Sequence, residues 1–131
     1  MLKKIIGVIA GLIVAFLLMM LFEYLNSLIF PFPAGMDLNN LAAVRAYSQT
    51  LPWTAYLMVI AGWVIASFFG GFVPGKYIPA SDIVAPLIIG ILLTAGSVGN
   101  FIMLEHPIWV MVIGVLVFIP MTVAGYKAAK S

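Results

Sequence analysis

Apolar residues fill four long stretches of the chain, and polar residues gather in the segments between them. The stretches cover about residues 5–30, 53–73, 83–104 and 108–126. A hydrocarbon core about 30 Å thick needs roughly 20 apolar residues of helix, and a helix satisfies its own backbone hydrogen bonds inside lipid. Membrane-barrel strands would alternate polar and apolar residues, which these stretches do not do. The pattern therefore predicts an all-α membrane protein, a single domain over residues 1–131 with four transmembrane helices.

The first connection, from Pro31 to Pro52, differs from the other two because it is about twenty residues long, too long to be structureless in a small domain. Asp37 is placed to cap a short helix over Leu38 to Gln49. We expect that helix to lie flat at the outer membrane interface. The second and third connections are short, so the second, third and fourth spans are expected to be antiparallel neighbours.

The composition agrees with a lipid environment. Of 131 residues, 65% are hydrophobic and 8% charged, with a mean hydropathy of +1.23, whereas a soluble domain is about 45–50% apolar and about 25% charged. The absence of cysteine excludes disulfides, thiolate metal sites, iron–sulfur clusters and a cysteine nucleophile.

The net charge is only +2 and the basic residues are scattered, while a nucleic-acid surface needs clustered lysine and arginine. Nucleic acid is therefore excluded as a partner, and no cofactor is expected.

The distribution of basic residues predicts the orientation. The two termini and the second connection carry Lys3, Lys4, Lys76, Lys127 and Lys130, and Arg45 alone falls on the other side. Cytoplasmic loops are enriched in lysine and arginine, so both termini are expected in the cytoplasm. A signal peptide is the competing interpretation of the first stretch. Its apolar run exceeds the usual length of roughly 7–15 residues and no A-x-A cleavage site follows, so we expect a retained helix.

Small residues recur at four-residue spacing along the second span. Helices associate in lipid through close packing of such residues. One row is Gly62, Ala66 and Gly70, a second is Ser67, Gly71 and Gly75, and the third span adds Ala95 and Gly99 with Gly90 and Gly96 beside them. Two rows on one helix suit a central helix with two neighbours. Packing within the chain and a homo-oligomeric interface both remain open.

One proline and several aromatic residues predict local features of the spans. Pro120 lies inside the fourth span and should kink it, leaving the carbonyl of Leu116 without its amide donor. Tyr77 and Tyr126 are expected at the inner interface, where aromatic residues gather. Trp63 lies in the middle of a span and is expected to be a packing residue.

Polar residues converge on one layer in the outer half of the membrane. Glu23 is the one ionisable residue clearly within a span, and Asn26 follows it on the same helical face. Asn100 of the third span reaches a similar depth, and His106 follows at that span's outer end. Ionisable groups in a membrane are costly and usually face the protein interior. These four residues form the candidate polar or ion site.

Three interpretations of this layer stay open. In the first, Glu23 is protonated or paired and joins the first span to the third; its candidate partners are Asn100, His106 and Arg45. This version also predicts that Glu23→Ala destabilises the chain by roughly 1–3 kcal/mol, because Asn100 loses its partner. In the second, Glu23 is a proton or solute site in an outward-facing cavity. In the third, Glu23, Glu105 and His106 bind a metal, a sparse ligand set without a paired-histidine motif.

Enzyme motifs are missing or incomplete. Gly70 to Lys76 matches the spacing of a phosphate loop, but Tyr77 stands where Ser or Thr must follow, and Pro74 removes a backbone donor. The sequence has no serine elbow and one histidine only. We therefore expect a protein that is not an enzyme.

The chain also shows a resemblance that covers its whole length. The matching pattern is Glu23…Pro31-x-Pro33-x-Gly35-Met36-Asp37…Leu51-Pro52 together with the glycine-rich second span. It resembles small bacterial four-helix integral membrane proteins that have no assigned activity, which implies architecture and an inner-membrane location but no catalytic residue. The expected function is a scaffold or accessory subunit of a membrane complex. The alternative is an oligomeric small-solute or ion transporter with its polar site at Glu23 and Asn100; the expected partners are lipid, other membrane subunits or a second copy.

Overall fold

The computed structural model describes residues 2–30, 35, 37, 39–48, 50–76, 78, 83–103 and 107–130. These residues form α-helices and no strand. The helices are α1 (Leu2–Ile29), α2 (Leu41–Ser48), α3 (Trp53–Gly75), α4 (Val84–Met103), α5 (Ile108–Leu116) and α6 (Phe118–Ala128). Taken together as one broken segment, α5 and α6 complete a set of four helices that are long and apolar enough to cross a membrane. The predicted all-α fold with four such helices is confirmed.

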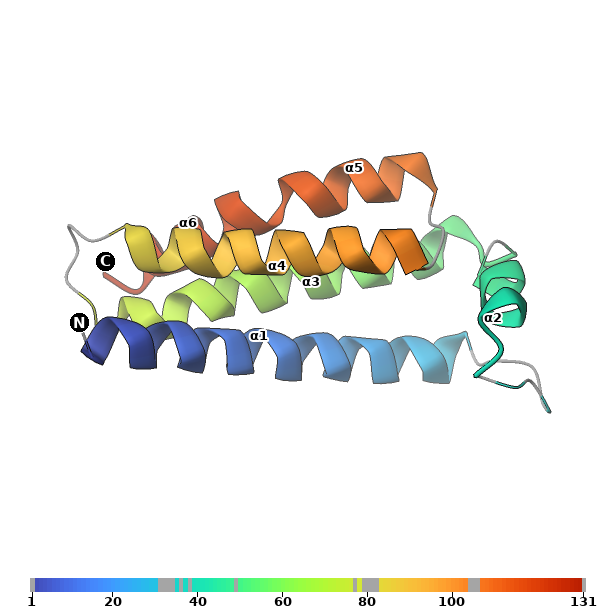
Figure 1. The fold of residues 1–131 in the computed structure, drawn as a ribbon, viewed down its shortest axis with the longest axis horizontal. Coiled ribbons are helices and arrows are strands. Elements are labelled where there is room, and N and C mark those ends of the chain that lie inside the picture. Colours follow the sequence, from blue (N-terminus) through green and yellow to red (C-terminus); the bar gives the residue numbers. More distant parts are fainter. Residues whose placement is uncertain are drawn as a thin grey trace.

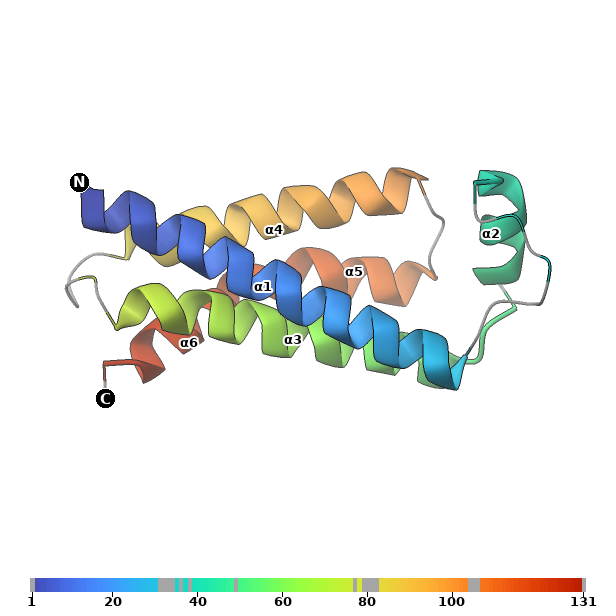
Figure 2. The same ribbon diagram turned by 90° about the horizontal axis from the view of Figure 1, so that it is seen from below.

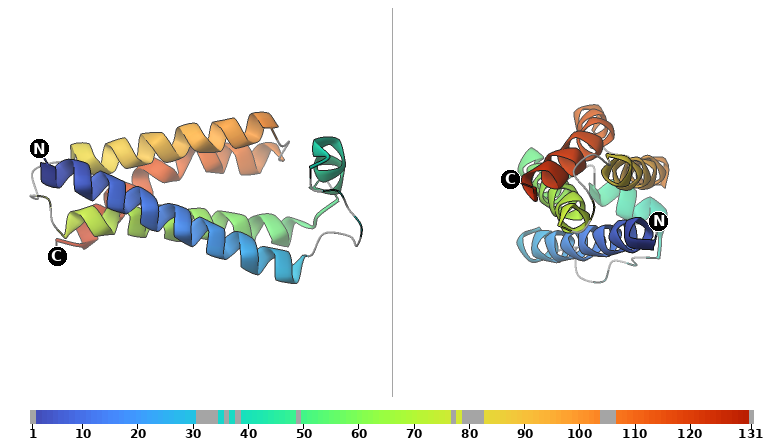
Figure 3. Two further views of the ribbon diagram at one scale, coloured as in Figure 1. Left: turned by 60° about the horizontal axis from the view of Figure 1, so that its bottom comes forward. Right: turned by 90° about the vertical axis from the view of Figure 1, so that its left-hand side faces the viewer.

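The four long segments run side by side, and α2 lies across one end of the bundle (Figure 1). Both chain termini lie at the opposite end, which we call the terminal end; the other is the α2 end. Helix α3 packs against α1 and against α6, and α4 packs against α6. Viewed from below, α1 crosses α3 obliquely and moves away from α4 toward the α2 end (Figure 2). The two views in Figure 3 show the same divergence.

The two small-residue rows of α3 face different neighbours. On one face, a Cβ added to Gly62 would lie 2.8 Å from Cβ of Phe22, and one added to Gly70 would lie 3.2 Å from Cβ of Ala15, both in α1. On another face, a Cβ added to Gly71 would overlap the carbonyl of Thr122 in α6. All six residues of the two rows, Gly62, Ala66, Gly70, Ser67, Gly71 and Gly75, are buried. Both rows therefore make close helix contacts within one chain.

The fourth long segment is broken at Val117, as the position of Pro120 predicts. The amide of Val117 donates to the carbonyl of Ile113 at 2.9 Å, and the amide of Met121 donates to the carbonyl of Val117 at 3.1 Å. Helical hydrogen bonding thus continues on both sides of the break. Pro120 has no amide hydrogen, so the carbonyl of Leu116 lacks its helical donor and the segment bends there. The predicted kink is confirmed.

The boundaries of the first and second spans differ from the prediction at the terminal end. Helix α1 begins at Leu2, three residues before the predicted start, so Lys3 and Lys4 are helical. Helix α3 continues through Pro74 to Gly75 instead of ending before the proline. A proline in the last turn removes only one helical hydrogen bond, so the helix can include it.

The short helix α2 begins later than predicted. In its first turn, the amide of Ala43 donates to Oδ1 of Asn40 at 3.3 Å, and the amide of Val44 donates to the Asn40 carbonyl at 3.1 Å. Asn40 is therefore the capping residue. Oδ1 of Asp37 accepts instead from the amide of Asn39 at 3.0 Å. The prediction that Asp37 caps a helix from Leu38 is wrong, because the aspartate side chain closes a local turn before the helix starts.

Tyr126 and Trp63 are both packing residues. Tyr126 is 1% exposed and lies in a cluster with Ile78 and Ala85, so its ring packs within the bundle, while its place at the inner interface stays a prediction. The Lys130 side chain lies over its ring, with Nζ 4.6 Å from the centroid. Trp63 contacts the rings of Phe101 and Phe118, at centroid distances of 6.0 and 5.9 Å. Tyr77 lies outside the described residues.

Candidate functional site

A groove of about 340 Å³ lies between α1 and α4 on the side of the α2 end. Its described lining residues are Phe16, Met19, Met20 and Glu23 of α1, Trp63 of α3, Leu92, Leu93, Gly96, Ser97 and Asn100 of α4, and Phe118 of α6. Most of the lining is apolar, and the polar groups lie on the α1 and α4 walls. We call this feature the α1/α4 groove.

The groove results from the different spacing of the two helices along the bundle. Nearer the terminal end, Ala15 of α1 and Ile89 of α4 belong to one buried cluster, so the two helices are close there. Toward the α2 end, a Cβ added to Gly96 or Gly99 of α4 would meet no atom within 4 Å. Among the described residues, therefore, no helix packs against these two glycines, in contrast with those of α3.

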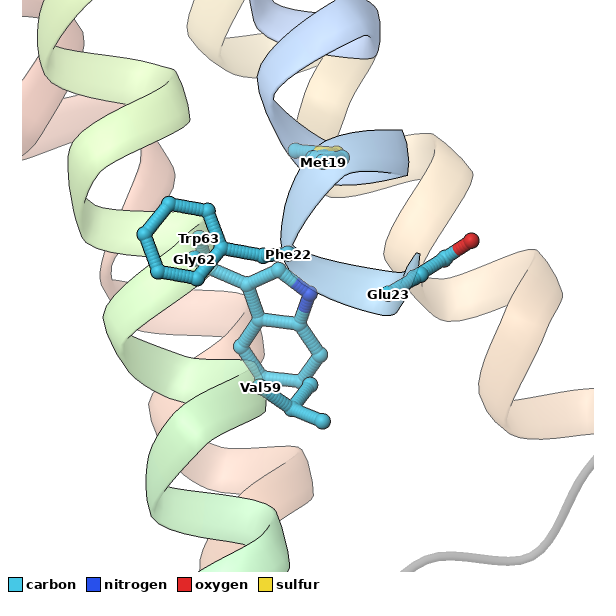
Figure 4. Close-up of a pocket in the computed structure, with 6 residues that line it drawn as sticks. All are labelled: Met19, Phe22, Glu23, Val59, Gly62 and Trp63. Carbon is cyan, nitrogen blue, oxygen red and sulfur yellow. The ribbon is translucent and has the colours of Figure 1, made fainter. Parts of the chain in front are cut away.

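Glu23 lies on the wall of the groove and is exposed. Figure 4 shows its side chain pointing away from Phe22 and Trp63, which pack between α1 and α3. A much smaller cavity of about 30 Å³ lies on that α3 side and is lined by Met19, Phe22, Glu23, Val59, Gly62 and Trp63. Glu23 makes no hydrogen bond or ion pair in the described part of the chain.

Asn100 lies on the opposite wall and is also exposed. Among the described residues its amide has no hydrogen-bond partner. The neighbouring Ser97 is buried, and its hydroxyl donates to the carbonyls of Thr94 at 2.7 Å and Gly114 at 3.3 Å. The groove therefore offers a carboxylate and an amide, while the serine hydroxyl bonds to its own bundle.

The remaining members of the predicted polar layer are not in the groove lining that the structure describes. Asn26 is half-buried, and its Oδ1 is shielded from solvent with no hydrogen-bond partner in the described part of the chain. Arg45 of α2 donates to the carbonyl of Ile102 at 3.3 Å, which links α2 to the end of α4. His106 and Glu105 lie outside the described residues. Among the residues described, no group of three or more histidine or acidic side chains could hold a metal ion.

The absence of a Glu23–Asn100 hydrogen bond changes one expectation. A cost of roughly 1–3 kcal/mol for Glu23→Ala requires that the two side chains be bonded to each other, since the cost comes from the unpaired partner. The structure places them on opposite walls of one groove without that bond. In the isolated chain, Glu23→Ala is therefore not expected to destabilise the fold by leaving Asn100 without a partner.

Sequence reasoning missed the role of Gly96. The third span's small residues were predicted to pack against neighbouring helices, and Gly90 does so, since an added Cβ would lie 2.9 Å from Cα of Ile119. Gly96 instead lines the groove. Its three-residue spacing from Gly99 is the only signal in the sequence, and it does not tell a filled contact from an open one.

Comparisons with protein-family models, with curated proteins and with solved structures give no match for this chain. The chemistry of the groove is therefore the guide to function. A carboxylate and an amide above an apolar floor can bind a hydrogen-bond donor carried by an apolar body.

Proposed function

We propose that this chain is a non-enzymatic accessory subunit of a membrane complex, which binds an apolar helix of a partner in the α1/α4 groove. In this proposal the chain spans a bacterial inner membrane four times, with both termini in the cytoplasm and α2 at the outer interface. The excess of lysine at the terminal end supports that orientation.

The carrying observation is the open face of α4 opposite an unpaired carboxylate. Gly96 and Gly99 have no neighbouring atoms at their Cβ positions, although small residues on membrane helices usually mark close helix contacts. Glu23 on the facing wall supplies an acceptor, so the partner helix should carry a donor such as a lysine, arginine or serine side chain. The partner helix would then cover both the glycines and the carboxylate.

The test is site-specific photo-crosslinking in native membranes. A crosslinker at Met20, which is 63% exposed on the groove wall, should give one discrete adduct, and one at Ile13, which is 53% exposed but not part of the groove lining, should not. Gly96→Leu fills the groove and should abolish the adduct. Ala95→Leu adds bulk at an exposed position outside the lining and should leave the adduct intact. Equal adducts from both crosslinker positions, or an adduct unaffected by Gly96→Leu, would refute a groove-specific partner.

A second candidate function is an oligomeric transport path, favoured by the placement of Glu23 and Asn100 on one groove. It predicts proton or ion flux after the purified chain is reconstituted in liposomes, and loss of that flux in Glu23→Gln. An accessory subunit predicts no flux from the wild type. Flux that depends on Glu23 would replace the accessory role with transport.

A further inference from the structure

Another large cavity, of about 360 Å³, lies at the terminal end of the bundle. Its described lining residues are Lys3, Ile6, Gly7 and Ala10 of α1, and Lys76, which follows the last residue of α3. We call it the basic cavity. It combines two cations with an apolar wall, whereas the α1/α4 groove at the other end combines an apolar floor with an acceptor.

The lysines at the terminal end differ in their contacts: Lys130 bonds to backbone carbonyls, whereas Lys3 and Lys76 line the basic cavity. Nζ of Lys130 donates to the carbonyl of Gly75 at 2.8 Å and to that of Ile78, so its charge stabilises the end of α3. Lys3 and Lys76 are exposed on the basic cavity, and Nζ of Lys76 lies 5.0 Å above the ring of Phe72. Neither ammonium group bonds to a protein acceptor within the described residues.

Little negative charge is present nearby to balance these cations. The acidic residues that the structure describes are Glu23 and Asp37, and both lie in the half of the bundle nearer the α2 end. In the sequence, the segments assigned to the terminal end hold five lysines against one aspartate, Asp82. The positive field at this cavity therefore favours an anion.

We propose that the basic cavity binds an anionic phospholipid. Its phosphate lies between the ammonium groups of Lys3 and Lys76, and an acyl chain follows the α1 surface past Ile6 and Ala10. Basic pockets between membrane helices on the cytoplasmic side bind lipid head groups in this way. The apolar wall formed by Ile6 and Ala10 suits a lipid better than free phosphate, which gains nothing from hydrocarbon contact.

The test measures lipid binding to the full chain in neutral detergent through the rise in its melting temperature. Phosphatidylglycerol should stabilise the wild type in a saturable way, and phosphatidylcholine should not. Lys3→Gln and Lys76→Gln should each weaken the apparent affinity by roughly fivefold, the effect of about 1 kcal/mol per basic residue. Lys127→Gln, an exposed lysine that does not line the cavity, is the matched control.

Each result bears on the site. If Lys127→Gln weakens binding as much as Lys3→Gln, the effect is general surface charge and the cavity is not a site. If inorganic phosphate at equal concentration stabilises the chain as strongly as phosphatidylglycerol, the ligand is a free anion and the lipid assignment fails. Lys3→Arg and Lys76→Arg keep the charge and should keep most of the affinity, so loss of binding there would also contradict it. Because the cavity lies at the opposite end from the groove, these outcomes are independent of the partner helix.

Discussion

Glycine residues hold α3 against α6 at a distance that no larger side chain permits. An added Cβ at Gly71 would lie 2.7 Å from the carbonyl carbon of Thr122, and one at Gly125 would lie 2.7 Å from that of Phe68. The obstacle is backbone in both cases, so it cannot move aside by a change of rotamer. Gly96, in contrast, has open space at its Cβ position.

Gly71→Ala should therefore lower the free energy of unfolding by about 1–3 kcal/mol, because the two helices must separate to admit a methyl group. Gly96→Ala is the control for helix propensity and should change it by no more than about 1 kcal/mol, in the stabilising direction. Reversible unfolding in mixed micelles titrated with sodium dodecyl sulfate measures both. Equal effects of the two substitutions would mean that the close α3–α6 contact is not formed.

At the scale of the element, Thr122 connects two helices through one hydroxyl. It is fully buried, and its Oγ1 donates to the carbonyls of Pro86 in α4 and Ile119 in α6, both at 3.0 Å. Thr94 offers a matched comparison, since its hydroxyl donates at 2.7 Å to Gly90 of its own helix. Of these three hydrogen bonds, the one from Thr122 to Pro86 joins α6 to α4, and the other two lie within one helix.

Thr122→Val should cost about 0.5–2 kcal/mol, the range for hydrogen bonds between membrane helices. Thr94→Val removes the same chemical group from within a single helix and should cost little. The same micelle titration compares them. A larger loss in Thr94→Val than in Thr122→Val would contradict the interhelical role of the hydroxyl.

The elements differ in how far the sequence predicts them. The four long helical segments follow from long, predominantly apolar runs, since composition and length suffice for a helix that satisfies its own backbone. The start of α2 does not follow, because Asp37 and Asn40 are both good capping residues and only the local turn decides between them. Depth along the helices predicts that Glu23 and Asn100 lie in one layer, and both line the α1/α4 groove. The width of that space depends on how α1 diverges from α4, and no local pattern encodes it.

At the scale of the whole molecule, the two ends of the bundle should lie on opposite sides of the membrane. The chain has no cysteine, so single cysteines can be introduced without background. Lys127→Cys at the terminal end and Asn39→Cys at the α2 end are both exposed positions. In intact cells, a membrane-impermeant maleimide should label Asn39→Cys, and Lys127→Cys should react only after the membrane is opened. Labelling of both in intact cells would contradict the assigned topology.

In the proposed membrane topology, the length of α1 has a consequence for the surrounding bilayer. After Lys4, the stretch from Ile5 to Ile29 spans about 38 Å at about 1.5 Å per residue, which exceeds a hydrocarbon thickness of about 30 Å. A helix with such a hydrophobic mismatch tilts, and it tilts more in thinner lipid. Because α1 already leans away from α4 toward the α2 end (Figure 2), added tilt in that direction separates the walls that carry Glu23 and Asn100. The thickness of the surrounding lipid would then set how readily a partner enters between them.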